Sequence, residues 1–146
     1  MLSSLSWDRP APEYNRPYMP PRYFSLDEAN SALEIIRPLM DEVQRIRNEI
    51  IAHRPEIWPA MARSAGNGGN PALSRLVNEF NRLDQAVRQI LATGAQIQDI
   101  NTGLLDFPAL RDGHEVDLCW KVGEREIAYW HEIDAGFAGR QTIDTF

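Results

Sequence analysis

The sequence contains one cysteine, so no disulfide can form within the chain, and a disulfide-stabilised scaffold is excluded. It also lacks an apolar run close to the ~20 residues that span a bilayer, and it has no secretory-type hydrophobic segment near its start. We therefore expect a cytoplasmic protein in a reducing compartment, with no membrane partner.

Positive charge is scarce as well. The chain carries 15 Lys and Arg against 21 Asp and Glu, a formal net charge of -6. Nucleic acid is therefore not expected as a partner, because its binding requires an excess of basic residues. A length of 146 residues predicts one domain that is large enough to bury a core.

Proline is concentrated near the start, where residues 1–22 hold five of the ten prolines. This composition is typical of a flexible arm, although its aromatic residues could instead dock on the body or on a second subunit. We expect residues 1–22 to form a proline-rich N-terminal arm and residues 23–146 to form a single α+β domain.

A long amphipathic helix is predicted from Ser25 onward. Ser25 and Glu28 have the spacing of a capping box, in which each side chain binds the backbone N–H of the other residue. Pro38 lacks an N–H, so we expect a kink or a break near it. Apolar residues recur every three or four positions and predict one stripe: Ala29, Leu33, Ile36, Met40, Val43, Ile46 and Ile50.

A second helix is predicted after a glycine-rich loop, with Asn70 as N-cap, Pro71 at the first position and Gly94 as the stop. Two long helices joined by one loop favour an antiparallel hairpin with coiled-coil-like packing. The second apolar stripe comprises Leu73, Leu76, Val77, Phe80, Leu83, Val87, Ile90 and Leu91.

Short β-rich runs follow at residues 103–107, 115–121 and 126–133, separated by Asp112-Gly113 and Gly123-Glu124 turns. The predicted fold class is therefore α+β, a long antiparallel helical hairpin followed by a small three-stranded antiparallel β-meander. The residues from Asp134 onward are expected to form a loop.

The two turns predict the register, with Leu110 opposite Glu115 and Lys121 opposite Glu126. Strand alternation then assigns the faces, although a one-residue slip would exchange them. The face expected to pack on the helices carries Leu105, Phe107, Val116, Leu118, Trp120, Ile127, Tyr129 and His131. The opposite face carries Leu104, Asp106, Asp117, Cys119, Lys121, Ala128, Trp130 and Glu132.

Several segments resemble a family of small uncharacterised bacterial and archaeal proteins, the domain of unknown function 2203. The resemblance covers residues 23 to about 142 and implies a shared fold and a shared C-terminal feature, but no activity. Its segments are Tyr23-Phe24-Ser25-Leu26-Asp27-Glu28-Ala29-Asn30, Gly103-Leu104-Leu105-Asp106-Phe107-Pro108, Leu118-Cys119-Trp120-Lys121-Val122-Gly123-Glu124, Trp130-His131-Glu132 and Gly136-Phe137-Ala138-Gly139-Arg140.

Metal-ligand residue types gather in the C-terminal third, and the candidate ligands are Asp106, Glu124 and His131. Oxygen ligands with one imidazole suit a divalent ion such as Mn, Fe or Zn. The spacing matches no established metal motif, and two plainer interpretations stay open. His131 could be a strand histidine hydrogen-bonded into the core, and Cys119 a small buried apolar residue.

The C-terminal third also contains residues for two further candidate sites, one catalytic and one anion-binding. Cys119 and His131 could form a nucleophile and its base, but the expected register places them on opposite faces. Gly136, Gly139 and Arg140 could bind an anion through backbone N–H groups and a guanidinium; the alternative is a tight surface turn in which Arg140 pairs with a carboxylate.

Two functional hypotheses follow. The favoured one is a non-catalytic interaction module that forms a homo-oligomer, with a dimer through the helical hairpin preferred, because the near-heptad stripes exceed what one partner helix covers. The alternative is a small divalent-metal-binding protein or metal-dependent enzyme, in which Arg140 contacts an anionic ligand.

Overall fold

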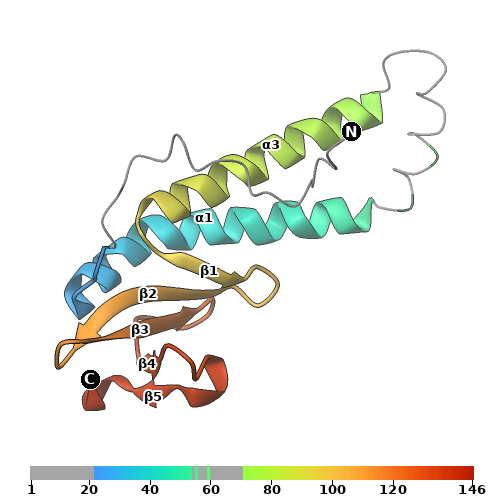
Figure 1. The fold of residues 1–146 in the computed structure, drawn as a ribbon. Coiled ribbons are helices and arrows are strands. Elements are labelled where there is room, and N and C mark those ends of the chain that lie inside the picture. Colours follow the sequence, from blue (N-terminus) through green and yellow to red (C-terminus); the bar gives the residue numbers. More distant parts are fainter. Residues whose placement is uncertain (1–21, 54, 56–58, 60–70) are drawn as a thin grey trace, which may run out of the picture.

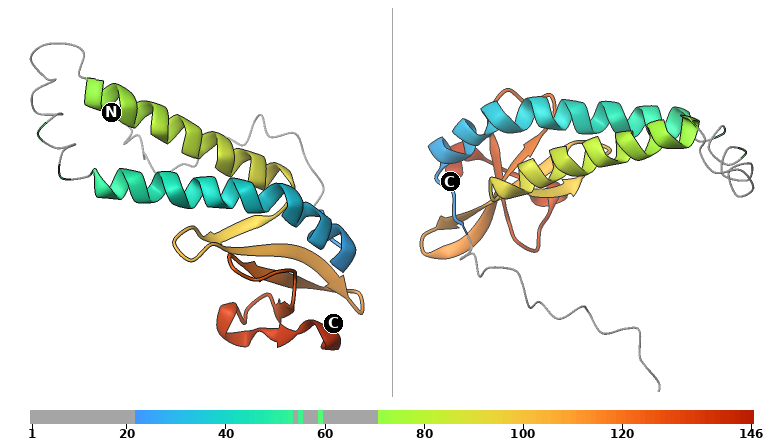
Figure 2. Two further views of the ribbon diagram at one scale, coloured as in Figure 1. Left: turned by 180° about the vertical axis from the view of Figure 1, so that it is seen from behind. Right: turned by 90° about the horizontal axis from the view of Figure 1, so that it is seen from above.

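The structure is a computed structural model, and it describes residues 22–53, 55, 59 and 71–146. Helix α1 (Leu26–Ala52) and helix α3 (Pro71–Ala92) run in opposite directions, side by side, over one face of a sheet (Figures 1 and 2). The predicted helical hairpin is thus present. The N-terminal arm and Asn70 lie outside the described residues. Within the described part of the chain, no helix is long and apolar enough to cross a membrane.

Helix α1 begins as the sequence predicts. The Ser25 hydroxyl accepts the Glu28 N–H at 3.1 Å, and the Glu28 carboxylate accepts the Ser25 N–H at 3.3 Å, which completes the capping box. The helix then continues through Pro38, so the expected break is absent. Buried residues on both sides of Pro38, such as Ile36 and Met40, pack against the core and offset the lost hydrogen bond.

Helix α3 starts at Pro71 and is followed by Gly94 at φ +100°, a left-handed conformation that suits glycine and ends the helix. Burial along α3 is confined to its C-terminal half, at Ala86 and Ile90. Val77 and Phe80, in the N-terminal half, are exposed. The hairpin extends past the sheet at this end (Figure 1).

The sheet has five antiparallel strands in the order β1-β2-β3-β4-β5, so the predicted three-stranded meander understates it. The strands are β1 (Gln96–Asp99), β2 (Leu104–Arg111), β3 (His114–Lys121), β4 (Tyr129–Glu132) and β5 (Gln141–Thr142). Sequence patterns missed β1 and β5 because they are only four and two residues long. Short 3-10 turns, Phe137–Gly139 and Ile143–Thr145, flank β5.

The β2–β3 register is the predicted one, with Leu110 opposite Glu115 and Asp106 opposite Cys119. The β3–β4 register is shifted by one residue, because Cys119 pairs with Tyr129 instead of Ala128. The connecting segment is not a tight turn. Ile127 donates its N–H to the Asn30 side chain of α1 at 2.8 Å. Because this contact holds the chain against the helix, β4 pairs with β3 one residue later along the chain than predicted.

The shift exchanges the two faces of β4. Trp130 moves to the face of Leu118 and joins the hydrophobic core, whereas Tyr129 and His131 leave the helix-facing side. The strand residues buried in that core are Leu105, Phe107, Ala109, Val116, Leu118, Trp120 and Trp130. His131 therefore shares the outer face of the sheet with Asp106 and Cys119.

We predict that Gly103→Ala destabilises the fold more than Gly113→Ala does. Both glycines have positive φ, +71° and +82°, so each alanine carries the same backbone strain of about 1 kcal/mol. A Cβ at Gly103 would also lie 2.8 Å from Val122 Cβ, whereas one at Gly113 meets nothing within 4 Å. Urea denaturation should show an extra loss of about 1–3 kcal/mol for Gly103→Ala; equal losses would contradict the steric argument.

Candidate metal site on the outer face of the sheet

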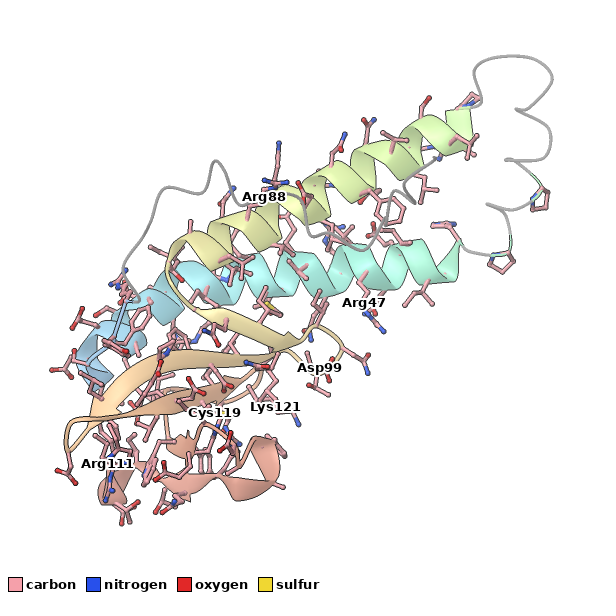
Figure 3. All side chains as sticks on the ribbon, in the orientation of Figure 1. Arg47, Arg88, Asp99, Arg111, Cys119 and Lys121 are labelled. Atoms are coloured by element: carbon pink, nitrogen blue, oxygen red, sulfur yellow. The ribbon has the colours of Figure 1, made fainter. Side chains whose placement is uncertain are left out.

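Three adjacent strands bring one metal-ligand side chain each to the same place. Asp106 on β2 is opposite Cys119 on β3, and His131 on β4 lies diagonally across from Cys119. All three side chains are buried, and their ligand atoms lie within 4.8 Å of one another. In Figure 3 the labelled Cys119 lies between β3 and the C-terminal segment, on the side away from the helices.

The hydrogen bonds of His131 define its protonation. Its Nδ1 lies 2.7 Å from the backbone carbonyl oxygen of Glu132, which can only accept, so Nδ1 carries a hydrogen. Its Nε2 lies 3.0 Å from Asp106 Oδ1. An unprotonated Nε2 and an ionised carboxylate are both acceptors, so this second contact requires a cation between them, either a proton or a metal ion.

The pKa of His131 agrees with that requirement. Burial disfavours the imidazolium, but the Glu132 carbonyl and the Asp106 carboxylate outweigh burial and raise the pKa above its usual value. In the metal-free protein, one proton thus lies in the buried contact between His131 Nε2 and Asp106.

Cys119 is fully buried, and this burial together with the Asp106 charge raises the pKa of its thiol to about 12. The guanidinium of Arg140 acts in the opposite direction but does not prevail. Cys119 is therefore a protonated thiol near neutral pH.

A cysteine nucleophile is disfavoured, but for a different reason from the one the sequence indicated. Cys119 and His131 share a face, so the expected separation onto opposite faces is wrong. However, both ring nitrogens of His131 already face other acceptors, and the thiol of Cys119 is not ionised. Neither group is arranged to activate the other.

Glu124 and Arg140 form a partly buried ion pair beside this cluster. Both Glu124 carboxylate oxygens contact Arg140 Nη2, at 2.6 and 2.9 Å, and one of them also accepts the Lys121 N–H. Arg140 Nη2 reaches the carbonyl oxygen of Cys119 at 3.5 Å. Among the sequence candidates for metal binding, the structure thus brings Asp106 and His131 together and engages Glu124 with Arg140.

The glycine loop before Arg140 closes on itself. The N–H of Gly139 donates to Gly136 and that of Arg140 donates to Phe137, so these backbone donors are used within the turn. Gly136 has a φ of +59°, and a Cβ at Gly139 would overlap the Cβ of Ala135. The loop therefore places the Arg140 side chain and offers none of these N–H groups to an anion.

A family model described as an uncharacterised conserved protein (DUF2203) matches residues 22–143 of this chain. The chain belongs to this family, and the match covers both helices and the sheet up to the C-terminal turn. Neither the curated proteins nor the solved structures contain a match.

The metal ligands predicted from the sequence are Asp106, Glu124 and His131, with Cys119 left open as a small buried apolar residue; the structure places Cys119 beside Asp106 and His131. The Asp112-Gly113 turn already pairs Asp106 with Cys119, and that pairing was the available signal. The position of His131 on the same face depends on the register of β4, and the sequence did not predict that register. The same register places Asp117 opposite His131.

We predict that Asp117→Asn stabilises the protein at neutral pH. Burial, followed by the Asp106 charge, raises the pKa of Asp117 to about 6, above the usual range of a carboxyl, so the ionised form is disfavoured in the folded state. The stability of the wild type relative to the variant should therefore fall as pH rises from about 4 through 6. At pH ~7 the gain should be about 1 kcal/mol, after a discount for the half-exposed side chain.

Urea denaturation at about pH 4 and about pH 7 measures this difference. Glu126→Gln, at an exposed position outside the strands, is the control and should change stability little at either pH. A gain for Asp117→Asn that is equally large at the lower pH would contradict the assignment.

Proposed function

We propose that this protein binds one divalent transition metal, best matched by zinc, through Asp106, Cys119 and His131. The observation that carries the proposal is the pair of His131 contacts, in which Nδ1 faces a carbonyl and Nε2 faces a carboxylate. In protein zinc sites, a ligating histidine usually donates its other ring N–H to an oxygen acceptor, which fixes the tautomer. The Glu132 carbonyl already occupies that position.

The spacing of the three ligand atoms supports this proposal. Zinc bonds of about 2.0–2.3 Å in a tetrahedral arrangement separate ligand atoms by roughly 3.3–3.8 Å. The three atoms lie within 4.8 Å of one another, so movements of about 1 Å would bring them into range. Side-chain rotations on fixed strands are sufficient for such movements.

The donor set narrows the choice of metal. One thiolate, one imidazole and one carboxylate combine soft, borderline and hard ligands, a set that suits zinc better than manganese or magnesium. Of the Mn, Fe and Zn expected from the sequence, the thiolate of Cys119 therefore favours Zn. Three protein ligands leave one coordination position for a further group, which is the arrangement of reactive zinc sites.

We predict that wild-type protein binds about one zinc per chain and that His131→Gln or Cys119→Ser weakens binding at least tenfold. The metal must displace the Cys119 thiol proton, whose pKa is about 12, and the proton held by His131. Affinity should therefore rise as pH rises from about 6 to about 8, with proton release on binding. Calorimetry in buffers of different ionisation enthalpy measures both quantities.

His114→Gln is the matched control, because the His114 side chain is half exposed and lies at the start of β3. It should bind zinc as the wild type does. Substitution of a buried residue can disturb folding, so each variant needs a circular dichroism spectrum and a cobalt titration. The Cys119→Ser variant should keep the fold but lose the thiolate-to-cobalt absorption band; retention of that band would refute ligation by Cys119.

A second candidate function is self-association through the helical hairpin, as a homodimer with a coiled-coil-like four-helix interface. It is favoured by the exposed apolar side chains on α3, where Val77 is 56% and Phe80 49% exposed, at the end of the hairpin that extends past the sheet (Figure 1). The fully buried residues of α3 are Ala86 and Ile90, nearer the sheet. The side chains of Val77 and Phe80 are therefore left uncovered, and a second copy would bury them.

We predict that wild-type protein is dimeric in sedimentation equilibrium and that Phe80→Glu is monomeric, because a charge at a buried apolar contact is costly. Gln89→Glu, at an exposed position on the same helix, adds an equal charge and should remain dimeric. A monomeric wild type at high concentration, or a dimeric Phe80→Glu variant, would argue against this interface.

A further inference from the structure

Arg140 carries a buried donor that the fold does not use. Its side chain is only 12% exposed, and its Nε atom is buried with no hydrogen-bond partner among the described residues. An unpaired buried donor is costly, and more so when the group is charged, so buried donors are nearly always paired. An acceptor is therefore expected at this atom.

Neighbouring side chains hold the guanidinium of Arg140. It lies over the rings of Tyr129 and Phe137, at 4.0 and 4.8 Å from their centroids, and both Glu124 oxygens bind Nη2. These contacts hold the plane of the guanidinium in place.

Arg140 lies next to Cys119, one of the proposed metal ligands. Tyr129, which supports the guanidinium, pairs directly with Cys119 across the strands. The Arg140 Nη2 lies 3.5 Å from the Cys119 carbonyl oxygen. The guanidinium and this proposed metal ligand thus lie on the same part of the outer face.

We propose that this site binds a small oxyanion, with one oxygen on the metal and another accepting the Nε–H of Arg140. This inference rests on the proposed metal site. A group with two oxygens on one central atom can serve a metal and an arginine together, and arginine recognises such groups through paired donors. The ligand chemistry is therefore a carboxylate or a tetrahedral oxyanion.

Calorimetric titration of the zinc-loaded full chain with acetate, sulfate and chloride tests this site. Acetate represents a carboxylate, sulfate represents a tetrahedral oxyanion, and chloride can reach the metal without accepting through a second oxygen. The wild type should bind acetate or sulfate more tightly than chloride, and Arg140→Lys should weaken that binding about tenfold or more, because lysine keeps the charge but loses the Nε–H.

Arg111→Lys is the matched control, since Arg111 also lies over an aromatic ring, that of Trp130 at 4.6 Å, but belongs to a different part of the sheet. It should bind the oxyanion as the wild type does. Zinc content is measured for every variant. A wild type that takes up no zinc refutes the proposed function. If the wild type takes up zinc but binds neither oxyanion, the oxyanion site alone is refuted. The same holds if the wild type and Arg140→Lys bind the oxyanion equally tightly.

Discussion

The imidazole of His131 is fixed between two oxygen acceptors, the Glu132 carbonyl on one side and the Asp106 carboxylate on the other. A neutral ring has one N–H and cannot satisfy both, so a positive charge must occupy the second contact. A proton between the two groups meets this requirement, and a metal ion would meet it as well. The candidate site depends on this constraint, because it aligns Nε2, Asp106 and the neighbouring Cys119 on one point.

The helices could be predicted from the sequence because their signals are local. The Ser25–Glu28 capping box, Pro71 at a helix start and Gly94 after a helix end each act within a few residues. The apolar stripe of α1 was also strong enough to carry the helix through Pro38. The Asp112-Gly113 turn likewise fixed the β2–β3 register and paired Asp106 with Cys119.

The position of His131 could not be predicted in the same way, because it depends on contacts between distant residues. The Ile127 N–H is held by Asn30 on α1, 97 residues earlier, and the Trp120 indole donates to the Glu124 carbonyl. Together these contacts widen the connection between β3 and β4 and shift the register by one residue. Glu124 was predicted as a metal ligand for a related reason. Its ion-pair partner, Arg140, lies sixteen residues further along the chain, so local sequence signals do not reveal the pair.

Two pairs of ionisable side chains lie side by side on the outer face of this small sheet: His131 with Asp106, which is buried, and Arg140 with Glu124, which is partly buried. Buried ion pairs are poor sources of stability, because desolvation of the charges offsets their attraction and apolar replacements are often as stable. The opposite face shows that this chain can cover a sheet with aliphatic and aromatic side chains. The charged face, with a buried Arg140 donor that has no partner among the described residues, therefore supports the proposed binding role. A cation at His131 and an oxygen acceptor at Arg140 would together satisfy the charges and donors that the fold leaves incomplete.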